Sequence, residues 1–319
     1  MIIYILALLG VFMSAQADVV REMTSQSTIA GLGSNQGTTV NYFAGDRQAA
    51  ESSIKWSSGF MKTVTRGKPA ESTTITRIDK EVVWTLDLKK KKYSEMTFAE
   101  FREMLKKGMA ENEEAKPEEE EEAPAREDAY EWTIVDSSST ESKAIHGWTC
   151  RNAHIIATGI NKQDTTDIVV ITIDNWNSEE VPGAQEIADY YARYLKALGL
   201  NELALTPGLL ASAQAYAEKM AEVLDKAKLA KGEAVTSLIG IKHHQMKGKK
   251  VSEAMKEGAA AEIAGKMPFG LGSKPKKEQP PEYIWKTVFM SETELTAAST
   301  DSVDPAKFEI PDGFKLEKK

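Results

Sequence analysis

The fold of this chain is decided by residues 73–96, which read TTITRIDKEVVWTLDLKKKKYSEM. Polar and apolar residues alternate in three short runs rich in β-branched and aromatic side chains, as in strands that bury one face. Two polar turns separate the runs, at Asp79-Lys80 and from Asp87 to Lys91. In the middle run, Trp84 and Leu86 point to the same face, because successive strand side chains alternate. The stretch therefore predicts a meander of antiparallel strands.

The same strand-like composition extends through residues 18–110. Residues 38–46 alternate in the same way, and residues 56–64 continue the aromatic and β-branched composition, so both are expected to be strands. Thr97 and Glu100 have the spacing of a capping box, which predicts a helix directly after Thr97.

Residues 129–319 restart with strands, continue with two helices and return to strands. The run IVVITI at 168–173 is apolar enough to be covered on both faces. A helical pair is expected at 185–230, with Gly199 as the C-cap of the first helix. Its apolar stripe is interpreted as a core contact, with a ligand lid as the alternative. The strand candidates are 130–135, 144–158, 167–174, 233–245 and 283–299, and the stripe of the first helix contains Ile187, Tyr191, Tyr194 and Leu198.

The whole net charge of −8 falls between Glu111 and Asp128. This segment has ten acidic and two basic residues and no aromatic or β-branched one, so it is expected to be a disordered, solvated linker. A site for a divalent cation or a basic partner is the alternative. The linker separates residues 18–110 from residues 129–319, and the two halves are expected to share one sheet. Glycine, proline and lysine predict a mobile loop at 259–281.

Residues 1–17 predict export. The apolar stretch Ile2–Met13 is shorter than the roughly 20 residues that span a bilayer, and Ser14-Ala-Gln-Ala17 is a small-x-small cleavage site. An uncleaved anchor is the alternative, since no Lys or Arg precedes the apolar stretch. Cleavage would give a periplasmic or extracellular protein without a transmembrane anchor. The single cysteine, Cys150, then has no partner in the chain and is expected to be a small buried apolar residue, with a reactive thiol as the alternative.

Composition limits the function further. With 41% hydrophobic and 28% charged residues, the chain is neither collagen-like nor fully disordered, and one cysteine excludes a disulfide scaffold. Positive and negative residues balance outside the acidic segment, so the lysine run at 89–92 is interpreted as a solvated turn and no nucleic-acid partner is expected.

The histidines do not form a recognisable catalytic or metal motif. If residues 144–158 are one strand, His146 and His154 share a face, but residues four apart along a strand already lie about 13 Å from each other. One zinc ion cannot bridge that distance. His243 and His244 are adjacent and would point to opposite faces. The sequence therefore predicts a protein that is not an enzyme, with no catalytic residues, no metal site and no cofactor.

Three segments resemble an uncharacterised family of secreted bacterial proteins, domain-of-unknown-function family 4412. Residues 75–96 resemble its signature, His146-Gly-Trp-Thr-Cys150 its glycine-aromatic-x-cysteine strand, and Phe308-Glu-Ile-Pro-Asp-Gly-Phe314 its closing segment. The family is similar in pattern to periplasmic lipoprotein carriers. The resemblance implies an α+β fold in which a strongly curved antiparallel sheet, a half-barrel, is partly covered by helices. The acidic linker and the long helical pair depart from the simplest carriers.

Together these features predict a noncatalytic periplasmic protein that binds a hydrophobic ligand, either a lipid or an acylated segment of a lipoprotein. Burying an acyl chain gains about 0.8 kcal/mol per CH₂, so such binding needs no catalytic group. The alternative is a scaffold for envelope stress or protein interaction, without a small ligand. The residues expected to line the ligand site are Trp84, Leu86, Tyr93, Met96 and Trp148.

Overall fold

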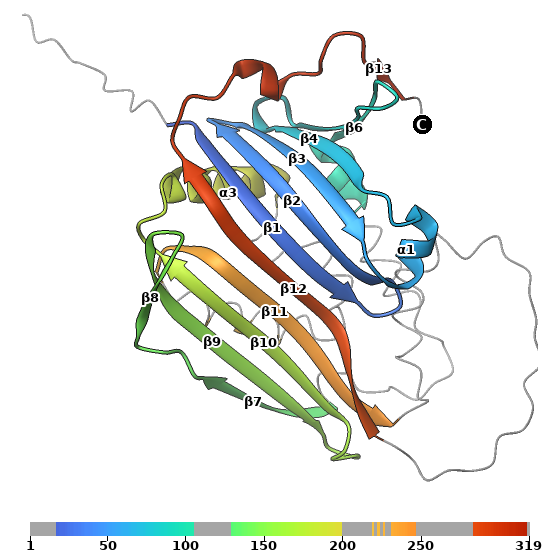
Figure 1. The fold of residues 1–319 in the computed structure, drawn as a ribbon, viewed down its shortest axis with the longest axis vertical. Coiled ribbons are helices and arrows are strands. Elements are labelled where there is room, and N and C mark those ends of the chain that lie inside the picture. The colour runs from blue at the N-terminus through green and yellow to red at the C-terminus, as the bar shows by residue number, and fades with distance from the viewer. Residues whose placement is uncertain are drawn as a thin grey trace, which may run out of the picture.

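The computed structural model describes residues 17–104, 129–199, 219, 222, 223, 226, 231–246 and 283–317. Within these residues, thirteen strands form a single open sheet (Figure 1). The acidic linker, the loop at 259–281, most of the second helix and all of the expected signal peptide except Ala17 lie outside the described residues.

The sheet runs in the order β13-β6-β5-β4-β3-β2-β1-β12-β11-β10-β9-β7, and β8 pairs with β9 beside this path. All pairings are antiparallel except β13 with β6, which confirms the predicted antiparallel sheet. The long β1–β12 ladder joins the N-terminal strands to the C-terminal ones. The strands are β1 (Val19–Ile29), β2 (Gly33–Ala44), β3 (Arg47–Trp56), β4 (Ala70–Arg77), β5 (Val82–Asp87), β6 (Lys92–Thr97), β7 (Tyr130–Asp136), β8 (Ser142–Ile145), β9 (Trp148–Asn161), β10 (Ile168–Ser178), β11 (Glu233–Met246), β12 (Tyr283–Ser299) and β13 (Lys315–Leu316).

The stretch at residues 73–96 folds as its pattern predicts. Its three runs lie in β4, β5 and β6, separated by the 3₁₀ turn η1 (Ile78–Lys80) and by a turn at 88–91. The capping box is also confirmed. The Thr97 N–H donates to Glu100 Oε2 at 2.8 Å, the Glu100 N–H donates to Thr97 Oγ1 at 3.1 Å, and helix follows at 98–104.

Residues 56–64 do not form the predicted strand. β3 ends at Trp56, and the helix α1 (Gly59–Thr65) follows. The backbone N–H groups of the two serines after β3 donate to Ser34 O at 2.8 and 3.3 Å, which turns the chain out of the sheet. Gly59 then adopts a φ of 74°. The Ser-Ser-Gly sequence is a local turn signal that outweighs the β-branched and aromatic composition after it.

The strand predicted at 144–158 is two strands. β8 and β9 are joined by a two-residue turn at His146-Gly147, where φ is 49° and 87°. Positive φ at both positions is typical of a tight hairpin turn, and Gly147 adopts it without a side-chain penalty. His146 therefore lies in a turn rather than in line with His154.

One face of the sheet carries the helix α3 (Ala184–Leu198); we call it the helix face, and the other the front face (Figure 1). Phe43 packs edge-on against Tyr190 with ring centroids 5.2 Å apart. Gly199 caps the helix in the left-handed conformation, as predicted. The buried stripe is shifted from the predicted one, because Tyr190 is 1% exposed whereas Tyr191 is half-buried. The buried residues of α3 are Ile187, Tyr190, Leu195 and Leu198.

The C-terminal segment, residues 300–317, covers the N-terminal half of the front face. It includes the 3₁₀ helix η5 (Pro305–Phe308), whose Phe308 is fully buried. Arg77 Nη1 donates to Phe308 O at 3.3 Å and also pairs with Glu309. The cluster between segment and sheet contains Ala44, Ala49, Ile75, Val82, Trp84, Leu86, Val303 and Phe308.

The C-terminal half of the helix face carries the largest apolar cluster. β10 contributes Val169, Ile171 and Ile173, all 0% exposed, while Ile168 and Val170 between them are half-buried. The run was expected to be covered on both faces; β10 is antiparallel to both neighbours, and it buries one face fully and the other in part. The buried cluster contains Tyr130, Ile155, Ala157, Val169, Ile171, Ile173, Val223, Ile241, Val288 and Phe289.

Candidate functional site

The expected ligand-lining residues do not gather in one site. Trp84, Leu86 and Tyr93 share the front face, since Leu86 pairs with Tyr93 and Trp84 with Glu95. Met96 lies on the other face, because it pairs with Val83 in the alternate register. Trp84 is 7% and Leu86 2% exposed, so the C-terminal segment leaves them little surface for a ligand.

Trp148 lies far along the sheet, at the start of β9. It packs on a separate cluster with the buried Cys150, Val181 and Leu295. Cys150 is a free cysteine that is 0% exposed, and burial raises the pKa of its thiol. Cys150 is therefore a small buried residue, as expected. Its raised pKa also lowers its reactivity, because the thiolate is the reactive form of cysteine.

The adjacent histidines of β11 point to opposite faces, as predicted, but both contact the turn before β10. His243 Nε2 bonds to Asp167 Oδ1, which also accepts a hydrogen bond from the Tyr130 hydroxyl at 3.0 Å. His244 Nδ1 bonds to Thr166 O at 2.7 Å. These bonds fix the turn. Among the described residues, no three His, Cys, Asp or Glu side chains come together as a metal site.

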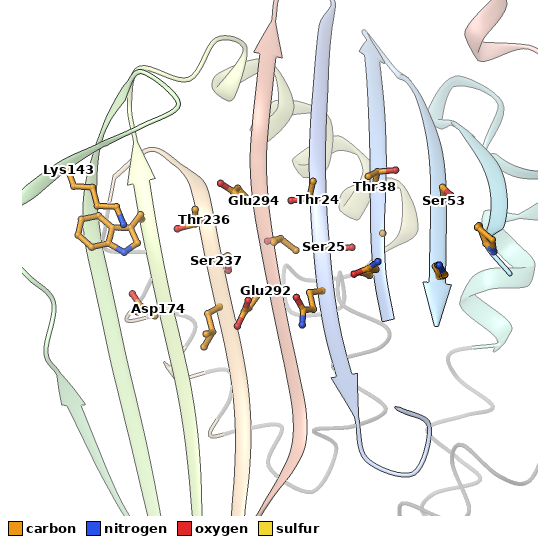
Figure 2. A pocket seen from close by; sticks show the side chains of 18 residues that line it. Thr24, Ser25, Thr38, Ser53, Lys143, Asp174, Thr236, Ser237, Glu292 and Glu294 are labelled. Carbon is orange, nitrogen blue, oxygen red and sulfur yellow. The ribbon is translucent and has the colours of Figure 1, made fainter. Parts of the chain in front are cut away.

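The front face has an open pocket of about 700 Å³ in the middle of the sheet (Figure 2). At one end the Lys143 ammonium lies 4.4 Å from the centre of the Trp176 ring. Glu294 Oε1 accepts a hydrogen bond from His146 Nε2 at 2.7 Å, and Asp174 Oδ1 accepts one from Asn152 Nδ2 at 2.6 Å. The lining residues are Thr24, Ser25, Gln26, Gln36, Gly37, Thr38, Ser53, Lys55, Pro69, Lys143, Asp174, Trp176, Thr236, Ser237, Leu238, Glu292, Thr293 and Glu294. Most of these side chains are polar, and Pro69, Trp176 and Leu238 add apolar surface among them.

A second front-face pocket, of about 400 Å³, adjoins the first through the shared residues Thr38 and Ser53. It lies where the C-terminal segment meets the sheet, and Leu86 is the one predicted ligand-lining residue in it. Leu88 and Pro311 give this pocket an apolar part.

The helix face has a buried polar cluster beside α3. Arg21, 4% exposed, pairs through Nη1 with Glu233 at the start of β11. Burial raises the pKa of the Tyr191 hydroxyl of α3; Glu233 raises it further and Arg21 lowers it, so these three groups are close enough to interact. Arg21 Nε and Nη2 have no hydrogen-bond partner among the described residues.

Sequence reasoning missed Arg21, although a signal was present. Val19, Arg21 and Met23 alternate along β1, and Val19 is a buried member of the α3 cluster. An arginine at an inward position of an otherwise buried strand end is unusual, since charged residues are seldom fully buried without pairing.

Comparisons with known proteins add no further assignment. No protein-family model matches the chain, and no curated protein matches it either. The relationship to family 4412 therefore stays a prediction. No helix of the described part of the chain is long and apolar enough to cross a membrane.

Proposed function

We propose that this chain is an exported, noncatalytic protein that binds a hydrophobic ligand, a lipid or an acylated segment of a lipoprotein, on the helix face of its C-terminal strands. The observation that carries the proposal is the apolar cluster from β7 to β12, which β1 and Val223 complete. Trp132, Ile134 and Ile239 at its margin are only half-buried. Such a surface can hold an acyl chain, at about 0.8 kcal/mol per buried CH₂.

The ligand would lie at the half-buried margin of this cluster, because the centre of the cluster is as fully buried as the front face around Trp84. There the chain's own Phe308 and Val303 already fill the space over Ile75 and Leu86. A ligand at that place would have to displace side chains that are themselves fully packed.

Export and a carrier-like shape are part of the same proposal. Residues 1–17 supply the signal for export. A curved sheet with helices on one face, as in lipoprotein carriers, would hold an acyl chain against the C-terminal strands.

The test is lipid uptake by the purified chain. Ile239→Trp adds bulk at the margin of the apolar cluster, whereas Leu238→Trp adds the same bulk on the front face of the same strand, and both positions are half-buried. We expect the native chain and Leu238→Trp to take up a fluorescent fatty acyl probe, and Ile239→Trp to bind it at least several-fold more weakly. Absence of uptake by the native chain would refute the proposal.

A second function, a scaffold for another envelope protein, is favoured by the open pocket on the front face, whose lining side chains are mostly polar. Its carboxylates, hydroxyls and amides suit a polar partner rather than a lipid. Deletion of residues 111–128 separates the two functions. A lipid-binding protein keeps its ligand after the deletion, whereas an adaptor that docks through the acidic segment loses its partner in a pull-down.

A further inference from the structure

The front-face pocket is a groove that crosses six neighbouring strands, from β3 to β10 (Figure 2). Residues that pair in register share a face of the sheet, and here they form two parallel rows. The first row is Ser53, Thr38, Thr24, Glu294, Thr236 and Trp176. The second row is Lys55, Gln36, Gln26, Glu292, Leu238 and Asp174. Every member of both rows lines the pocket, and at a strand spacing of about 4.8 Å the rows are about 24 Å long.

The hairpin of β8 and β9 borders the β10 end of this groove. From β8, the Lys143 ammonium lies over the Trp176 ring, and Ile145 packs in the same cluster as that ring. From the hairpin turn, His146 Nε2 donates to Glu294 Oε1 of β12, so the turn reaches past β10 and β11 towards the middle of the sheet. The hairpin thus gives the groove a wall. The volume of about 700 Å³ lies within the range of roughly 300–1,000 Å³ that is typical of ligand sites.

The middle of the groove is polar and open to solvent. The exposed side chains there are Thr24, Gln26, Gln36, Thr38 and Glu292. Their hydroxyl, amide and carboxylate groups supply both donors and acceptors of hydrogen bonds. Trp176 and Leu238 give the β10 end an apolar part. The groove therefore suits a polar ligand that also has some apolar surface.

Charge and topology exclude other classes of ligand. The lining includes three carboxylates and two lysines, so a phosphate polymer would meet an excess of like charge. A hydrocarbon chain would remove water from the polar side chains without replacing its hydrogen bonds. An extended peptide typically adds to a free strand edge, whereas β1 and β12 in the middle of the groove are paired on both sides. An uncharged polar molecule that is recognised by side chains remains.

A sugar chain has these properties. Each sugar hydroxyl both donates and accepts hydrogen bonds, so it matches amides, hydroxyls and carboxylates alike. Its bonds to a carboxylate are of the stronger, charge-assisted kind. We propose that the groove binds a neutral linear oligosaccharide, laid across the strands with its hydroxyls at Gln26, Gln36 and Glu292 and one ring against Trp176 and Leu238. This site is independent of the proposed lipid site, because the two lie on opposite faces of the sheet.

The test is the binding of neutral hexasaccharides to the purified chain, measured by isothermal titration calorimetry. The probes are cellohexaose, maltohexaose and the hexamer of N-acetylglucosamine. We expect at least one of them to bind, and to bind about tenfold or more tightly than the disaccharide of the same sugar. The disaccharide should bind more weakly because it fills only part of a groove about 24 Å long.

Variants then locate the site. Thr24→Trp places a large side chain in the middle of the groove without disturbing the core, since Thr24 is exposed. Thr85→Trp is the matched control, because Thr85 is also an exposed strand threonine but lies in β5, outside the pocket. We expect Thr24→Trp to weaken binding about tenfold or more and Thr85→Trp to bind like the native chain. Glu292→Ala removes an acceptor without adding bulk; it should weaken binding about tenfold, and it tests the site if Thr24→Trp folds poorly.

The outcomes separate this inference from the proposed function. Absence of binding by all three hexasaccharides refutes the sugar site, and so does native affinity in both Thr24→Trp and Glu292→Ala. Tighter binding of the glucosamine hexamer than of its N-acetylated form would also overturn it, since the carboxylates would then select a cation. Lipid binding is tested separately by uptake of the acyl probe, which Thr24→Trp should leave unchanged.

Discussion

Phe308 holds the C-terminal segment on the front face, and its removal should be costly. The ring is 0% exposed, packs in the cluster with Ile75 and Trp84, and has the Arg47 guanidinium 4.9 Å from its centre. Truncation of a fully buried phenylalanine to alanine typically costs about 3–5 kcal/mol. That loss is a large fraction of the roughly 5–15 kcal/mol by which folded proteins are stable. We therefore expect Phe308→Ala to lower the free energy of unfolding by about 4 kcal/mol.

Urea unfolding followed by far-ultraviolet circular dichroism measures this loss. With a denaturant slope of about 2 kcal/mol per molar, the midpoint should fall by about 2 M. Phe60→Ala is the control, because Phe60 is 44% exposed and its truncation should change stability by less than about 0.5 kcal/mol. Equal midpoints for the two variants would refute the packing argument for the C-terminal segment.

The same variant tests where the ligand binds. If lipid occupies the helix face, Phe308→Ala should leave the affinity of the folded protein for an acyl probe unchanged. If uptake instead rises several-fold, the segment competes with the ligand, and the site lies around Trp84 and Leu86.

Three further predictions follow from particular contacts. The hydrogen bond from Arg77 holds the pKa of Asp79 below its ordinary value of 3.8. The contribution of this pair to stability is therefore complete above pH 3.8 and is lost as the pH falls through the lower pKa of the folded state. Arg77→Met should flatten the acid limb of a profile of stability against pH. Gly59→Ala places a Cβ 2.4 Å from the Cα of Gly33 in β2, whereas the Cβ of Gly45→Ala meets no atom within 4 Å. Both glycines have positive φ, so backbone strain alone should destabilise Gly45→Ala by about 1–2 kcal/mol, and Gly59→Ala should lose more. Thermal unfolding of the two variants checks this order. Cys150 should react with a thiol reagent slowly in the native protein and quickly in urea, and rapid native labelling would contradict its burial.

The strands of residues 73–96 could be predicted because their information is local. Alternation, polar turns and a capping box all lie within a few residues of the structure that they determine. The turn at His146-Gly147 was equally local, but the strand-like residues on both sides concealed it. There, two residues with positive φ decided the structure against the composition of the surrounding segment.

The site could not be predicted in the same way, because its contacts are distant in the sequence. Phe308 covers Trp84 from the end of the chain, and the sequence pattern of β5 alone does not show what will cover its apolar face. Arg21 meets Glu233 only because β12 and β11 are placed beside β1. A period-two pattern assigns a residue to a face, but it does not say which distant segment reaches that face.

The C-terminal segment is fastened to the front face by polar contacts as well as by packing, which disfavours a ligand site beneath it. The C-terminal segment is tied to the sheet by polar contacts along its length: the Val303 N–H donates to Asp18 at 2.9 Å, and Lys307 pairs with Glu51 at 2.6 Å. Displacing it would break these contacts as well as the packing of its aromatic residues. A lipid site around Trp84 and Leu86 would therefore cost both kinds of contact, which argues for a ligand elsewhere on the sheet.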